Sequence, residues 1–128
     1  MSSKSNNVVT KDLFKLFKDE CIKWLNAFGL TDWSVTFSCD GNTITGPLAS
    51  VQYTPDGLSA HITISKYWED QPMTKIQIQR CALHEVCHIL TARMELLAQE
   101  RFISEREIME ESEKIARKIE HSIWQWGR

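Results

Sequence analysis

The chain has 128 residues, of which 42% are hydrophobic and 25% are charged, and its formal net charge is −2. These values are typical of a globular domain, and there is neither a basic tract nor a run of about 20 apolar residues, so we expect no nucleic-acid binding and no membrane span. The four cysteines form no Cys-x-x-Cys pair, and the first ten residues lack the apolar core of a signal peptide. We therefore expect one cytoplasmic domain, residues 1–128, with reduced thiols.

The N-terminal third predicts a flexible end followed by one amphipathic helix. Residues 1–9 are small and polar, which favours a flexible terminus. Thr10 can cap a helix that runs to about Phe28, and Gly29 suits the position just after a helix. The apolar residues of this segment recur at three- and four-residue steps, as in a helix that covers a core: Phe14, Phe17, Cys21, Leu25 and Phe28.

Three strand-like segments follow, at residues 33–38, 48–53 and 60–65. Each alternates between apolar and polar side chains, and turn residues separate them. We expect the second and third segments to pair as an antiparallel hairpin across the turn at residues 54–57. Because Pro47 precedes it and Ser50 and Gln52 are polar, the segment at 48–53 is predicted to form an edge of the sheet.

The most specific motif of the chain is His84-Glu-Val-Cys-His88. Thr74 and Gln77 form a capping box that predicts a helix over about residues 75–97. At about 100° per residue, an apolar face gathers on one side of this helix, and both histidines point away from it. Two imidazoles one turn apart can bind one metal ion, and the glutamate between them can hold and deprotonate a water molecule.

The last segment predicts a helix that carries a third metal ligand. Ser104 and Glu107 form a second capping box, which starts a helix over about residues 105–125. A catalytic zinc takes three protein ligands and keeps a fourth position for water. Glu113 borders the apolar stripe and is our choice, with Glu110 and Glu111 as alternatives. The stripe that we expect to be buried consists of Ile108, Ser112, Ile115, Ile119, Ile123 and Trp126, with Met109 and Ala116 at its edge.

These two segments resemble the zincin metallopeptidases, in particular the glutamate-liganded (gluzincin-like) kind. The stretch Glu113-Lys-Ile-Ala116-Arg-Lys-Ile119 is similar to the Glu-x-x-Ala-x-x-apolar stretch of ImmA/IrrE-type peptidases and of small phage-encoded relatives. The SprT-like proteins share His-Glu-x-x-His, but their downstream His-Gly-containing ligand motif is absent here. The resemblance implies a minimal zincin-like α+β fold: an N-terminal helix, a three-stranded sheet with a hairpin edge strand, the active-site helix and a C-terminal glutamate-bearing helix.

The resemblance implies that the chain is a zinc-dependent metallopeptidase. His84, His88 and Glu113 would bind Zn²⁺, and Glu85 would be the catalytic general base. The substrate would be a peptide or protein that docks as an extended strand along residues 48–53, in the cytoplasm, or in the host cytoplasm if the protein is phage-encoded. Four side chains are candidates for stabilising the oxyanion of the reaction: Tyr53, His61, Tyr67 and His121.

Three other interpretations stay open at this point. Cys81 shares a helix face with His84 and His88 and could complete a structural zinc site, although such sites usually have a fourth protein ligand. The chain could also be a zinc-binding interaction module on a zincin scaffold that performs no proteolysis. A metal-free α+β domain is the third interpretation. The sequence specifies neither the substrate nor the oligomeric state.

Overall fold

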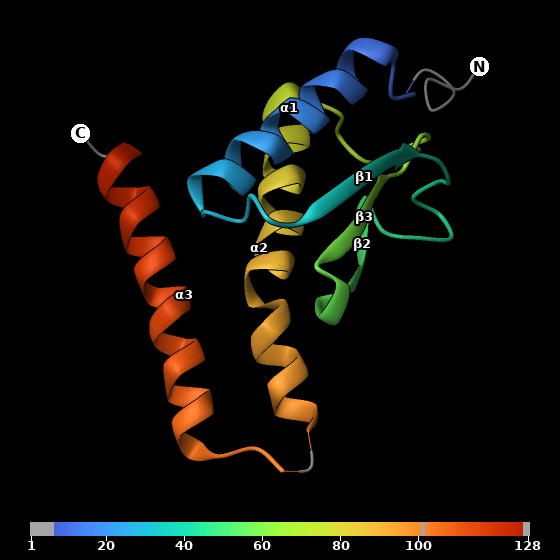
Figure 1. Cartoon of the computed structure of the whole chain (residues 1–128). Helices are drawn as coiled ribbons and strands as arrows, with labels where there is room; N and C mark the ends of the chain where they lie inside the picture. The colour runs from blue at the N-terminus through green and yellow to red at the C-terminus, as the bar shows by residue number, and fades with distance from the viewer. Residues whose placement is uncertain (1–6, 101, 127–128) are drawn as a thin grey trace.

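The computed structural model describes residues 7–100 and 102–126, which form three helices and a three-stranded mixed sheet (Figure 1). The expected α+β class is thereby confirmed. Within the described ranges, no helix has the length and apolar character needed to cross a membrane. The elements follow one another as α1 (Lys11–Ala27), β1 (Ser34–Cys39), β2 (Ala49–Thr54), the short 3₁₀ turn η2 (Pro55–Gly57), β3 (Ser59–Ile64), α2 (Lys75–Gln99) and α3 (Glu105–Trp126).

Helix α1 begins and ends where its sequence predicts. The Thr10 hydroxyl accepts the backbone N–H of Leu13 at 3.2 Å, and Gly29 follows the helix with a φ of 71°, a conformation that glycine adopts without strain. The helix crosses the N-terminal half of α2 (Figure 1). Its buried residues are those of the predicted apolar stripe, Phe17, Cys21 and Leu25.

The segment before α1 is held against the protein. The Asn7 side chain donates to the Glu69 carbonyl at 2.7 Å, and the N–H of Val9 donates to the Lys66 carbonyl at 2.8 Å. Val9 itself is buried. The prediction of a flexible terminus is therefore wrong for residues 7–9, because these hydrogen bonds to the loop after β3 fix them, while residues 1–6 lie outside the described part of the chain.

The sheet has the order β1-β3-β2, with β1 parallel and β2 antiparallel to β3. The predicted hairpin of β2 and β3 is confirmed, and so is the edge position of β2. Ile62 and Ile64 of the central strand are fully buried on the face that packs against α1 and α2. Alternate residues of each strand point to the opposite face. That face is polar, because these residues include Thr36, Ser38, His61 and Thr63.

Helix α2 has the buried back and open front that its sequence predicts. The Thr74 hydroxyl accepts the N–H of Gln77 at 3.1 Å and caps the helix. The back is buried through Ala82, Val86, Ile89 and Leu90, whereas His84 and His88 are exposed. Cys87 is exposed, because it lies about 100° past Val86 and outside the buried face.

Helix α3 starts as predicted but buries a different face. Ser104 and Glu107 form the complete capping box, with reciprocal hydrogen bonds of 3.1 and 3.4 Å. The predicted buried stripe is wrong: Ile108, Ser112, Ile119 and Ile123 are exposed, and the side chain of Trp126 lies outside the described residues. The packed face consists instead of Glu111, Ile115, Lys118 and Ser122. The sheet and α1 already cover most of the apolar back of α2, so only a narrow strip of α2 is left for α3.

Candidate metal and catalytic site

The front of α2 presents two adjacent imidazoles. His84 and His88 lie one turn apart, with ring centroids separated by 4.9 Å and ring planes at 80°. Both side chains are exposed, so a metal ion and a substrate could reach them from solvent. The two rings are adjacent because regular helix geometry places residues four apart on the same face.

Glu85 lies beside these histidines but is turned into the protein. Only 5% of its surface is exposed. Burial raises the pKa of its carboxyl group, and the neighbouring His84 and His88 oppose that effect. A glutamate that is partly shielded from water and close to two potential metal ligands has the environment expected of a general base.

A cavity of about 380 Å³ lies between this part of α2 and the start of β2. The wall that precedes β2 is held in place by Ser65, whose hydroxyl donates to the Pro47 carbonyl at 2.6 Å and whose N–H donates to the Leu48 carbonyl at 2.8 Å. The edge strand and the motif thus share one cavity. Its lining residues are Pro47, Leu48, Ala49, Gln77, Arg80, Cys81, His84 and Glu85.

The far end of β2 is tied to the same face of α2. The Tyr53 hydroxyl donates a hydrogen bond to the Glu95 carboxylate, and this bond raises the pKa of the tyrosine. Glu95 lies seven residues after His88, which is close to two full helix turns. Strand β2 therefore contacts the front of α2 on both sides of the histidine pair.

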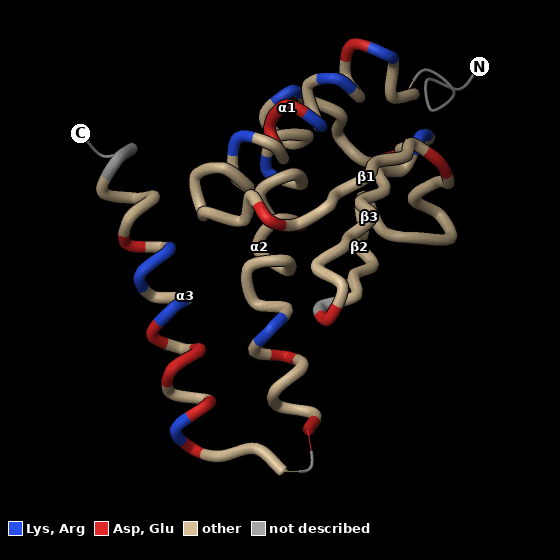
Figure 2. Tube along the Cα trace, viewed as in Figure 1, with Lys and Arg blue, Asp and Glu red and all other residues tan. Residues whose placement is uncertain are grey.

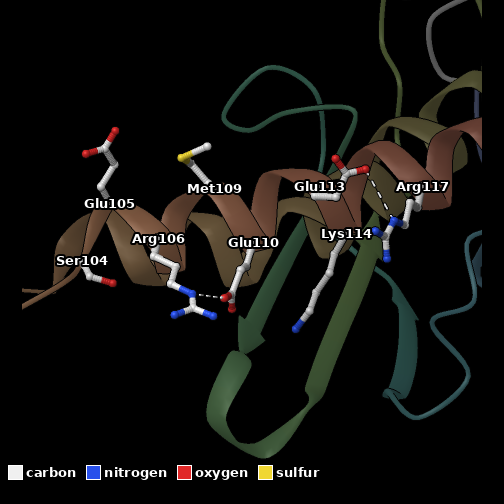
Figure 3. Close-up of a pocket in the computed structure, with 8 residues that line it drawn as sticks. All are labelled: Ser104, Glu105, Arg106, Met109, Glu110, Glu113, Lys114 and Arg117. Atoms are coloured by element: carbon white, nitrogen blue, oxygen red, sulfur yellow. Dashed lines mark hydrogen bonds and ion pairs between the residues drawn. The ribbon is translucent and has the colours of Figure 1, made fainter.

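The proposed third ligand is not at this site. The Glu113 side chain is 61% exposed and forms an ion pair of 3.4 Å with Arg117, on the outer side of α3 (Figure 3). Glu113 lies about 200° around the helix from Glu111, the glutamate that faces the protein. The outer side of α3 borders a surface hollow of about 940 Å³, which is lined by α3 and the Ser104 cap and by neither histidine.

Neither alternative glutamate takes its place. Glu110 forms a 3.0 Å ion pair with Arg106, and Glu111 borders a small cavity beside Ile89 and Arg93. Arg93 lies nine residues after His84, about half a turn around α2, so that cavity is on the side of α2 opposite the histidine. Across residues 7–100 and 102–126, no three His, Cys, Asp or Glu side chains come together as a metal site.

Cys81 lines the cavity but has the properties of a protonated thiol. Burial, and then the nearby Glu85 carboxylate, raise its pKa. Metal binding requires the thiolate, which both effects disfavour in the metal-free protein.

Of the four candidates for oxyanion stabilisation, only Tyr53 lies between β2 and α2. His61 lies on the polar outer face of the sheet, where its two ring nitrogens meet the hydroxyls of Thr36 at 2.7 Å and Ser38 at 2.8 Å. Tyr67 pairs with the N-terminal segment and the loop after β1, and His121 is on α3. These positions separate all three from the cavity at the motif.

Sequence reasoning did not identify several residues of the site. Arg80 and Gln77 precede His84 by four and seven residues, and Glu95 follows His88 by seven. Helical spacing alone places them on the same face as the histidines, and this signal was available in the sequence. The sequence contains no such signal for Pro47, Leu48 and Ala49, because their place at the cavity depends on how the sheet packs on α2.

No protein-family model, curated protein or solved structure matches the chain. The case for a function therefore rests on the residues of this site.

Proposed function

We propose that this chain is a zinc-dependent metallopeptidase in which His84 and His88 bind the metal and Glu85 is the general base. The observation that carries the proposal is the shared cavity, in which His84 and the shielded Glu85 face the start of the edge strand β2. A peptide hydrolase needs a metal-binding face, a base and a surface for extended substrate in contact with one another.

The residues present fit zinc in two of the three required positions. Paired imidazoles are common zinc ligands, and these two lie one turn apart on an open face. When bound, zinc would act as a Lewis acid on the scissile carbonyl and on the attacking water. Glu85 would accept a proton from that water and then donate it to the leaving amine.

Strand β2 would hold the substrate. It is at the edge of the sheet, so one row of its backbone N–H and C=O groups is available to pair with an extended peptide. The cavity at its first residues would receive the side chain nearest the cleaved bond. Arg80 and Gln77 at this cavity are the polar groups that such a side chain would meet.

Glu113 is the third ligand in this proposal, and it can reach the histidines only if α3 turns and moves on metal binding. Two features of α3 make such a movement inexpensive in free energy. Most of the apolar stripe of the helix is exposed, and the packed face contains the polar residues Glu111, Lys118 and Ser122. The side chains of α3 itself therefore bury little apolar surface in its present position, which limits the free-energy cost of moving the helix.

The test is hydrolysis of an unstructured protein by the wild type and by Glu85→Gln, with the zinc content of both proteins measured. We expect Glu85→Gln to keep its zinc and to lose a factor of about 10² to 10⁴ in rate, the usual contribution of a general base. Equal rates in the two proteins would contradict the proposal.

The second candidate is a zinc-binding interaction module without proteolysis. It is favoured by one observation, that the third ligand lies away from the histidines while the edge of β2 is open. In that case the wild type would bind an extended peptide and leave it intact. Ala49→Pro on β2 would reduce binding, because the register with β3 leaves the Ala49 N–H on the open edge of the strand and proline removes it.

A further inference from the structure

The outer side of α3 carries an apolar face that the described structure leaves largely open. Met109 and Ile123 are 63% and 65% exposed, and Ile108 and Ile119 beside them are 38% and 39% exposed. We call these four residues the outer apolar face. At about 100° per residue they lie to one side of the packed face that contains Glu111 and Ser122. An exposed apolar face of this kind on a helix is typical of an interaction surface.

A row of alternating charges borders the outer apolar face. At about 100° per residue, Arg106, Glu113, Arg117 and Glu120 fall within about 60° of one another, next to Met109. Figure 3 shows Met109 and Glu113 projecting to the same side of the helix. Read along α3, the row has the charge order plus, minus, plus, minus. Read in the opposite direction, the order is minus, plus, minus, plus.

We propose that a second copy of this chain packs antiparallel against the outer apolar face of α3. A two-fold axis near residue 114 would place Glu113 near Arg117 of the second copy, and Arg106 near its Glu120. A surface that is complementary to itself in this way is what a symmetric dimer requires. A parallel pair would instead place the two rows on opposite flanks of the apolar contact, where their charges could not pair.

The charge distribution of the whole helix favours the same arrangement. Residues 105–113 contain five glutamates and one arginine, a net charge of −4. Residues 114–124 contain three cations and one glutamate, a net charge of +2. Figure 2 shows acidic residues concentrated in the N-terminal half of α3 and basic residues in the half that follows. Antiparallel pairing places each acidic half against a basic half.

The size of the surface determines how the dimer would respond to salt. A helix of 22 residues is about 33 Å long, and a standard interface buries about 800 Å² on each partner. Four apolar side chains cover only part of that area, so the flanking charged side chains must contribute. Because these charges are exposed, we expect the dimer to weaken as the salt concentration rises.

This inference goes beyond the proposed function and does not depend on it. None of the residues of the outer apolar face lines the cavity at His84. The proposed dimer forms from the metal-free arrangement of α3. Zinc binding by Glu113 would turn the same helix, so the protein is dialysed against a chelator before the measurement.

The experiment is sedimentation equilibrium of the wild type and of Met109→Glu/Ile123→Glu, at about 0.1 M and about 1 M salt. We expect the wild type to dimerise and the double variant to dimerise at least tenfold more weakly. Ile76→Glu, at a residue of α2 that is 70% exposed, is the matched control and should behave as the wild type. A wild type that is monomeric at about 100 μM, or a double variant that dimerises as tightly, would overturn the proposal.

Charge reversal tests the direction of pairing. Arg106→Glu/Arg117→Glu makes the whole row acidic, so an antiparallel dimer should weaken at least tenfold. Adding Glu113→Lys and Glu120→Lys restores alternation with opposite signs and should restore dimerisation. In a parallel dimer the two rows lie on opposite flanks and do not face each other. An unchanged dissociation constant after the first change would therefore contradict the antiparallel arrangement.

Discussion

Helices α2 and α3 have similar sequence signals and different surroundings. Each begins at a hydroxyl cap and carries apolar residues at helical spacing. The apolar back of α2 is enclosed by α1 and the sheet, whereas most of the apolar stripe of α3 is exposed. An apolar stripe thus predicts that one face of a helix will pack against something. The arrangement of the other elements decides whether that partner belongs to the same chain.

The largest difference should appear when one isoleucine in each helix is shortened. Ile89→Ala removes a buried side chain from α2, and we expect the free energy of unfolding to fall by about 2–5 kcal/mol. Ile123→Ala removes an exposed side chain from α3 and should change the stability of the monomer by less than about 0.5 kcal/mol. Denaturant titration of dilute protein measures both. Similar losses in the two variants would show that α3 is packed as firmly as α2.

The next effect concerns the buried glutamate of α2. Since burial raises the pKa of Glu85, the folded protein favours its protonated form, and the ionised form destabilises the fold at neutral pH. Glu85→Gln should therefore raise the melting temperature of the metal-free protein near pH 7. The gain should shrink as the pH falls below the ordinary pKa of glutamate, where both states of the wild type are protonated. A variant less stable than the wild type at pH 7 would contradict this account.

A smaller effect separates the two helix caps. Thr74→Ala removes the hydroxyl that caps α2 and should lower the free energy of unfolding by about 1 kcal/mol. Ser104→Ala removes the matching hydroxyl from α3, and its effect should be local, because α3 has few contacts whose loss would unfold the core. Hydrogen exchange should then show faster exchange of the first amides of α3 with unchanged protection of β3 and α2.

The elements whose signals are local could be predicted from the sequence. Capping chemistry placed the start of α1 at Thr10 and that of α2 at Thr74, and alternation predicted the strand over residues 60–65 in which Ile62 and Ile64 are buried. The edge position of β2 followed from the proline before it and its polar alternate residues. The same logic placed both histidines on the open face of α2, where the structure has them.

The features that depend on packing between distant elements could not be predicted. The choice of Glu113 assumed that α3 packs against α2 through its apolar stripe, whereas α3 packs near Ile89 through the face that contains Glu111. The hydrogen bond from Tyr53 to Glu95 joins residues 42 apart in the sequence. Neither helix spacing nor alternation contains information about such contacts.

The most direct test of the proposed metal centre is the zinc content of the purified wild type beside three single variants. We expect one zinc per chain in the wild type and its loss in His84→Ala and in His88→Ala, since each removes one of the paired ligands. Glu113→Ala should also lose zinc if α3 moves to supply the third ligand. Wild-type protein without zinc, or full zinc retention when both histidines are replaced together, would contradict the account.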